Sequence, residues 1–323
     1  MIPDPHPHRP NVYAAAPLDR AAHRRKDAAW LESALTDPAA RVLPLWRGQN
    51  LVTGGTESPR AATLPGPAAR PLAAAAGISP VFLGLYRDAP LFALDLTPVA
   101  EPLALPELAG TLAGTGAAFF DLRVTGPLME GGEAAVCAGA RGLTWWNARH
   151  RFCGVCGAPA ESAEGGHVRV CSNADCATHH FPRTDPAVIM LVHDGAGRCV
   201  LSRQEKWPAG MHSVLAGFVE PGESLEDAVA REVFEEVGLR VTDVRYRSSQ
   251  PWPFPASLML GFTARAVDTA ITVDGSELES ALWVSREEIR ALPAVPPPDA
   301  PFRLARPDSI AHRLIAEWAA GND

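Results

Sequence analysis

The stretch GFVEPGESLEDAVAREVFEEVGL, residues 217–239, decides the fold of the C-terminal part of this chain. Ser224, followed three residues later by Asp227, predicts a capping box at the start of a helix. Gly238 predicts the end of this helix, because a glycine in the left-handed conformation commonly closes one. The pattern therefore predicts a helix over residues 224–237.

Three glutamates, Glu232, Glu235 and Glu236, share one face of the predicted helix, because residues three and four apart are neighbours on a helix surface. Carboxylates this close repel one another unless a cation lies among them, and hard oxygen ligands suit Mg²⁺ or Mn²⁺. A solvated acidic surface is the alternative. It fits less well because a stripe of valines lies beside the acidic stripe, and because Arg231 can orient a neighbouring carboxylate. The helix is therefore a candidate divalent-metal site.

Two close cysteine pairs precede this region. They are Cys153 with Cys156 and Cys171 with Cys176. Each pair can supply two thiolates from a tight turn, and two such turns complete a tetrahedron around one structural Zn²⁺ per chain. A redox Cys-x-x-Cys motif is the alternative, but it leaves the second pair unexplained. His179 and His180 are further possible ligands. We expect a closed zinc site.

The rest of the chain predicts a mixture of helices and strands. In the N-terminal half we expect helices near 20–35 and 127–149, with β-rich runs between about residues 40 and 122. In the C-terminal part we expect a hairpin of residues 187–193 and 198–204. Strands at 241–248, 257–267 and 281–285 and a closing helix at 307–320 should follow it. This alternation is typical of an α+β or α/β domain.

Composition excludes several classes of protein. The net charge of −8 argues against a dedicated basic coat for nucleic acid. No segment reaches the roughly 20 apolar residues that span a bilayer. The N-terminal MIPDPHPHRP lacks the positive and apolar regions of a secretory signal. We therefore expect a cytoplasmic protein without a membrane segment.

The acidic stretch resembles the Nudix box, G-x5-E-x7-R-E-U-x-E-E-x-G-U with U aliphatic. The matching residues are Gly217, Glu223, Arg231, Glu232, Val233, Glu235, Glu236, Gly238 and Leu239. Together with the cysteine pairs, FPRTDPAVIMLV (181–192) and SQPWPFPAS (249–257), the box resembles the NADH pyrophosphatase subfamily of Nudix hydrolases. This similarity covers about residues 145–320.

The resemblance implies three domains. A Nudix α/β/α sandwich would occupy residues 182–323, preceded by a small zinc ribbon at 150–181 and a mainly β N-terminal domain at 1–149. It also implies hydrolysis of NAD(H) to nicotinamide mononucleotide and AMP, or removal of NAD caps from RNA, in a homodimer. A catalytically silent module that senses nucleotides is the alternative from another functional class.

Site residues follow from the resemblance position by position. The divalent metal would be bound by Glu232, Glu235, Glu236, the carbonyl of Ala216, and Glu277. Glu236 is the first choice for the catalytic base, with Glu235 or Glu277 second and Glu232 as a further catalytic carboxylate. The substrate-binding residues would be Phe181, Phe218, Gln250, Pro251, Trp252, Pro253, Phe254, Pro255, Ala256, Ser257 and Ala311. One of the rings of Trp252 and Phe254 is expected to fill the core, and the other to stack on the substrate.

Overall fold

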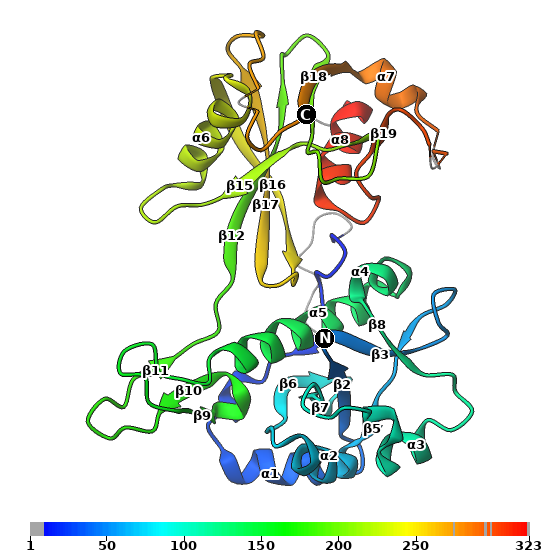
Figure 1. Ribbon diagram of the computed structural model, residues 1–323, viewed down its shortest axis with the longest axis vertical. Helices are drawn as coiled ribbons and strands as arrows, with labels where there is room; N and C mark the ends of the chain where they lie inside the picture. Colours follow the sequence, from blue (N-terminus) through cyan, green and yellow to red (C-terminus); the bar gives the residue numbers. More distant parts are fainter. Residues whose placement is uncertain (1–9, 274, 294–295, 298, 322–323) are drawn as a thin grey trace. The chain divides into compact units, whose positions relative to one another are not determined.

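The computed structural model describes residues 10–321 except 274, 294–295 and 298 (Figure 1). The chain forms two compact units. The N-terminal unit comprises Val12–Thr184 and Trp252–Ala256. The C-terminal unit comprises Asp185–Pro251 and the chain from Ser257 onward, together with Pro10 and Asn11. The segment MIPDPHPHR, used above in the argument on secretion, lies outside the described residues.

The C-terminal unit contains a sheet with strand order β16-β17-β12-β13-β18, in which β15 also pairs with β12. Its strands are β12 (Asp185–His193), β13 (Arg198–Arg203), β15 (Leu215–Phe218), β16 (Val241–Trp252), β17 (Ser257–Ala266) and β18 (Ser280–Ser285). β17 runs parallel to β12, with Ser257 opposite Asp185. A separate pair joins β14 (Met211–His212) to β19 (Arg303–Leu304). The expected hairpin of β12 and β13 is confirmed.

Helices cover both faces of this sheet. Alternate residues of β12 point to opposite faces, so Val188, Met190 and Val192 pack with α6 (Leu225–Val237). Ile189 and Leu191 pack with α8 (Ile310–Ala320) on the other face. A short helix, α7 (Arg286–Ala291), follows β18. Figure 1 shows α6 and α8 on opposite sides of the sheet, which confirms the expected α/β/α sandwich.

The ends of α6 lie where the sequence predicts them. The Ser224 hydroxyl accepts a hydrogen bond from the Asp227 amide (3.1 Å), and Gly238 is left-handed with φ of 70°. The Asp227 carboxylate accepts from the Ser224 hydroxyl (2.6 Å). This geometry is one half of the predicted capping box. The complete box is found instead at the start of α7, between Ser285 and Glu288.

Strand β16 extends further than expected and includes Pro251 and Trp252. Because β16 is an edge strand, a proline can lie in it without removing a ladder hydrogen bond from the centre of the sheet. The turn to β17 then consists of residues 253–256. The tip of this hairpin, Trp252–Ala256, packs within the N-terminal unit.

The N-terminal unit contains its own sheet, with order β1-β6-β7-β2-β3-β4, in which β5 pairs with β2 and β8 with β3. The strands are β1 (Leu18–Asp19), β2 (Arg41–Trp46), β3 (Gln49–Thr53), β4 (Arg60–Ala61), β5 (Leu64–Pro65), β6 (Val81–Tyr86), β7 (Ala89–Asp95) and β8 (Ala118–Phe120). The helices are α1 (Ala28–Thr36), α2 (Ala69–Ala76), α3 (Pro106–Thr111), α4 (Leu122–Thr125) and α5 (Gly131–Arg149). The domain expected to be mainly β is therefore a mixed α and β domain.

This sheet repeats the topology of the C-terminal unit. β2 pairs with parallel β7 and with antiparallel β3 and β5, as β12 pairs with parallel β17 and antiparallel β13 and β15. β8 pairs with β3 as β18 pairs with β13. Helix α2 follows β5 as α6 follows β15. Helix α5 comes after β8, the last strand of this sheet, as α8 comes after β18. The N-terminal sheet is thus a second version of the same arrangement.

A three-stranded antiparallel sheet follows α5. Its order is β11-β10-β9, with β9 at Ala160–Ala163, β10 at Val168–Cys171 and β11 at His179–His180. The turns beside these strands carry the two cysteine pairs.

Candidate active site

Two glutamates of α6 are buried. Glu232 retains 9% of its exposure and Glu236 retains 4%, whereas Glu235 is exposed. Carboxylates are rarely this buried unless they are paired or bind a cation. The predicted acidic face is therefore not a solvated surface at these two positions.

The Glu232 carboxylate lies directly against β15. A Cβ atom added to Gly217 would come within 1.8 Å of Glu232 Cδ, far inside a normal contact distance. Glycine at this position lets the strand approach the carboxylate. Ala216, the expected carbonyl ligand, precedes it on β15 and pairs with Ile189 of β12.

Arg231 connects the acidic residues. Its guanidinium forms two hydrogen bonds to Glu223 (2.6 and 2.8 Å), and Nη1 donates to Glu232 and Glu235 (2.8 and 2.9 Å). Nη2 also donates to the carbonyl of Phe218 (2.9 Å). The predicted role of Arg231 in orienting a carboxylate thus has a geometric basis, because a fork of charge-assisted bonds fixes direction as well as distance.

Charge in this cluster is strongly unbalanced. Hydrogen bonds from Arg231 lower the pKa of Glu223 to about 2. Burial raises the pKa of Glu232; Arg231 opposes this effect, and the charges of Glu235 and Glu277 add to it. Three box glutamates, Glu223, Glu232 and Glu235, are therefore bonded to one arginine, and the buried Glu232 resists ionisation. An additional cation at this position would relieve that strain.

Glu277 and Glu279 of the sequence SELES have different surroundings. Glu279 is bound to Arg203, with 2.6 Å between Oε2 and Nε. The charge of Glu277 acts on Glu232. Of these two residues, Glu277 is the one whose charge reaches the α6 cluster. An all-oxygen set of this kind fits Mg²⁺ or Mn²⁺.

The expected substrate residues do not all share one environment. Gln250 is fully buried, donates to the carbonyl of Asp308 (2.8 Å) and accepts from the amide of Ile310 (2.8 Å). This differs from the expectation that Gln250 binds substrate, because its amide connects β16 to the start of α8. Ala311 is also buried. Phe181 and Phe218 are 65% and 60% exposed, so their rings are accessible.

Trp252 and Phe254 pack against each other and against Tyr13, with ring centroids 5.1 to 6.1 Å apart. Arg123 and Arg141 lie over the Phe254 ring at 4.3 and 5.0 Å. Arg141 also donates to the carbonyl of Pro253 (2.8 Å). Both rings therefore serve the packing of the N-terminal unit. Both residues are only half-buried, so stacking of one of them on the substrate stays a prediction.

Tyr13, Arg123 and Arg141 were not identified from the sequence. They lie more than 100 positions from the loop that they contact, and nothing in their local sequence links them to it. Only the folded chain brings them together.

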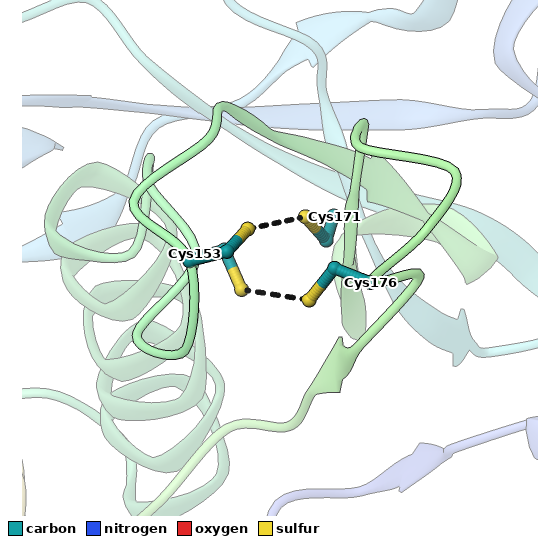
Figure 2. Close-up of side chains that lie close together, drawn as sticks. Cys153, Cys171 and Cys176 are labelled. Carbon is teal, nitrogen blue, oxygen red and sulfur yellow. Dashed lines mark hydrogen bonds between the residues drawn. The ribbon is translucent and has the colours of Figure 1, made fainter.

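The four predicted zinc ligands converge. The sulfur atoms of Cys153, Cys156, Cys171 and Cys176 lie within 4.8 Å of one another, with 3.8 Å between Cys153 and Cys176 and 3.4 Å between Cys156 and Cys171. Figure 2 shows the labelled cysteines directing their sulfurs toward one another from separate turns. Zn–S bonds of ~2.3 Å arranged tetrahedrally require sulfurs ~3.8 Å apart. The cluster therefore fits structural zinc.

Hydrogen-bond donors favour the thiolate at two of the four cysteines. The Thr178 hydroxyl lowers the pKa of Cys176, whereas burial raises the pKa of Cys171 to about 12. Amide hydrogen bonds from Cys156 and Val155 lower the pKa of Cys153 to about 6. His180 Nε2 lies 3.3 Å from the Cys153 sulfur, so this histidine contacts a ligand sulfur at hydrogen-bond distance. Outside the cluster, burial raises the pKa of Cys137 and Cys199 to about 12. These two thiols are buried in hydrophobic cores.

Three family models match the chain. The NUDIX domain matches residues 183–305, the NADH pyrophosphatase-like rudimentary NUDIX domain matches residues 39–146, and the NADH pyrophosphatase zinc ribbon domain matches residues 148–181. The rudimentary domain agrees with the repeated sheet topology of the N-terminal unit. None of the helices in the described part of the chain is long and apolar enough to cross a bilayer.

Curated relatives match more than half of this chain. The chain is 46% identical over 193 residues to "NAD-capped RNA hydrolase NUDT12" of Macaca fascicularis, covering 58% of this chain and 42% of that protein. It is 44% identical over 225 residues to "NAD-capped RNA hydrolase NudC" of Mycobacterium bovis (strain BCG / Pasteur 1173P2), covering 68% of this chain and 69% of that protein. The match thus spans less than half of the NUDT12 relatives and about two thirds of the NudC relative.

Proposed function

Because this chain belongs to the Nudix hydrolase family, with the rudimentary domain and zinc ribbon of NADH pyrophosphatases, we propose that it hydrolyses the pyrophosphate bond of NAD(H). Water and the dinucleotide would yield nicotinamide mononucleotide and AMP. The observation that carries this proposal is the pair of buried glutamates on α6, one of them lying against Gly217.

The metal site we propose consists of Glu232, Glu235, Glu236, Glu277 and the carbonyl of Ala216. When bound, Mg²⁺ or Mn²⁺ would neutralise the pyrophosphate oxygens and promote attack at phosphorus. Zinc would serve only to hold the ribbon together, because four cysteines leave it no open position.

The residues of the box divide the remaining work. Glu236 would accept the proton of the attacking water, since it is the most buried carboxylate of the cluster. Arg231 would hold Glu232 in place. Its guanidinium is already bound to three carboxylates, so the metal and not Arg231 would stabilise the charge that develops on the phosphate. Glu235 and Glu277 are second choices for the base.

Substrate recognition would depend on Phe218. Its ring is exposed, and Arg231 holds its carbonyl beside the acidic cluster. A flat nicotinamide or adenine could stack on it. Ser257, at the start of β17, would add a hydrogen bond. Phe181 is an exposed second ring of the N-terminal unit.

Product analysis tests the proposal. NADH, NAD⁺, ADP-ribose and a diadenosine polyphosphate would each be incubated with the protein and Mg²⁺ or Mn²⁺, and the products identified by mass. We expect nicotinamide mononucleotide and AMP from NAD(H), and loss of turnover with unchanged fold in Glu236→Gln. No cleavage of any of the four would instead support the silent nucleotide-sensing module.

NAD-capped RNA is the second candidate substrate, favoured by the printed names of the relatives. Phosphates beyond the cap would add contacts with lysine or arginine, so cleavage of capped RNA should depend on salt more steeply than cleavage of free NAD. Equal salt dependence would argue for the free dinucleotide. The homodimer stays a prediction from the resemblance, and the cytoplasmic location stays a prediction from composition. Light scattering tests the homodimer.

A further inference from the structure

The repeated topology of the N-terminal unit allows its faces to be compared with those of the C-terminal unit. The counterpart of α6 is α2, whose sequence ARPLAAAA contains no acidic residue. The metal-binding helix is therefore not repeated. The opposite face, covered by α5, corresponds to the face that α8 covers in the C-terminal unit.

A cavity of about 390 Å³ lies on this α5 face. Its lining includes Arg41 and Leu43 of β2, the β6–β7 turn with Tyr86 and Arg87, Ala89 and Leu91 of β7, Arg60 and Ala61 of β4, and Glu133 and Val136 of α5. This size is within the range of small-molecule sites.

The strand register identifies the corresponding place in the C-terminal unit. Arg41 pairs with Leu91 and Pro65, as Ala187 pairs with Met259 and Phe218. Ala89, two residues before Leu91, therefore corresponds to Ser257, two residues before Met259. One lining residue of the cavity, Ala89, thus occupies the sheet position of Ser257, which is one of the expected substrate residues.

The chemistry of the lining separates into two parts. Leu43, Leu91 and Val136 belong to the buried core and form an apolar surface. Tyr86 is partly buried beside them. Such a surface, with an aromatic ring at its edge, suits a flat apolar group.

The second part is cationic. Arg60 lies near Glu133 and Glu130, at 3.2 and 3.5 Å. Within the described residues, Arg41 and Arg87 have no carboxylate partner. Arg41 is positioned by hydrogen bonds from Nη1 to the carbonyls of residues 38–40, and the Arg87 guanidinium lies 5.3 Å from the centre of the Tyr86 ring. Two uncompensated guanidiniums favour a phosphate.

We propose that this cavity of the rudimentary domain binds a nucleoside monophosphate, with the base on the apolar surface beside Tyr86 and the phosphate on Arg41 and Arg87. The site contains no acidic helix and would bind without hydrolysis. It rests on the geometry of this domain and is independent of the reaction proposed for the C-terminal unit.

Calorimetry with AMP tests this site in the full-length chain. AMP has no pyrophosphate bond to hydrolyse, so it would be titrated into the unaltered chain, without added divalent metal. We expect Arg41→Gln/Arg87→Gln to weaken one component of AMP binding by about ten-fold or more. The affinity of any AMP bound at the C-terminal unit should not change in this variant. The difference in AMP binding between the variant and its parent therefore measures binding in the cavity.

Arg47→Gln is the matched control, because Arg47 also lies in a strand turn with φ of 51° and stacks on an aromatic ring, Trp46, outside the cavity. Arg87→Gln alone, at an exposed position, guards against misfolding and should weaken the same component. Unchanged AMP binding in both Arg87 variants would overturn the proposal. Inorganic phosphate that binds as tightly as AMP would also overturn it, because the apolar surface would then contribute nothing.

Discussion

Replacing Gly217 with alanine tests how closely the acidic helix and β15 must approach. The new Cβ would lie 1.8 Å from Glu232 Cδ, and ordinary contacts begin at 3.4 Å. The carboxylate would have to withdraw by about 1.6 Å. Glu232 is buried and bonded to Arg231, so it cannot make this shift without disturbing that bond.

The expected loss follows from this displacement. A misplacement of about 1 Å in a catalytic group commonly costs about 100-fold in rate, which corresponds to about 2.7 kcal/mol in activation free energy. We therefore expect kcat for NADH to fall by about 100-fold or more in Gly217→Ala, with a smaller change in KM.

Steady-state kinetics with Mg²⁺, together with thermal unfolding, measures this effect. Gly142→Ala is the matched control, because a Cβ at this helical glycine meets nothing within 4 Å and should leave kcat unchanged. Shortening the acid in Glu232→Asp makes room for the new methyl group. Adding Gly217→Ala to Glu232→Asp should therefore cost much less than it costs alone. Full activity in Gly217→Ala would refute the argument.

Three further results are expected. Cys171→Ser should lose zinc on dialysis and lower the Tm, as metal analysis and calorimetry would show; a full equivalent of retained zinc would contradict the ligand set. Phe254→Ala should reduce the free energy of unfolding, measured in urea, by about 2 kcal/mol. Ser257→Ala should mainly raise KM for NADH. Equal stability of the two variants would contradict the packing role of Phe254. Burial lowers the pKa of His167 to about 4, so the unfolded chain binds more protons between pH 6.5 and 4. Stability should fall by about 2 kcal/mol from pH 7 to 5, and less in His167→Gln; equal losses would exclude this histidine.

Local signals explain why the C-terminal fold was predictable. Ser224 and Gly238 mark the two ends of α6, and they were predictable because helix caps depend only on residues that are close in sequence. The four cysteines were also predictable, because each pair is close in sequence and zinc geometry demands two such pairs.

Other features depend on contacts that no local pattern contains. The burial of Gln250 depends on the distant start of α8. The β5–α2 segment is too short and too alanine-rich to mark a second sheet of the same topology. The extension of β16 through Pro251 could not be predicted from the sequence, because the effect of a proline depends on whether its strand lies at an edge.

The packing of the β16–β17 tip has a consequence for dissecting the protein into fragments. A fragment that starts at Asp185 would contain Trp252 and Phe254 but lack Tyr13 and Arg141. Two aromatic rings would then be exposed to solvent, which favours aggregation. The boundary between sequence domains is therefore not a boundary between independent folding units. A loss of packing in the N-terminal core should lead to local unfolding of β16 and β17.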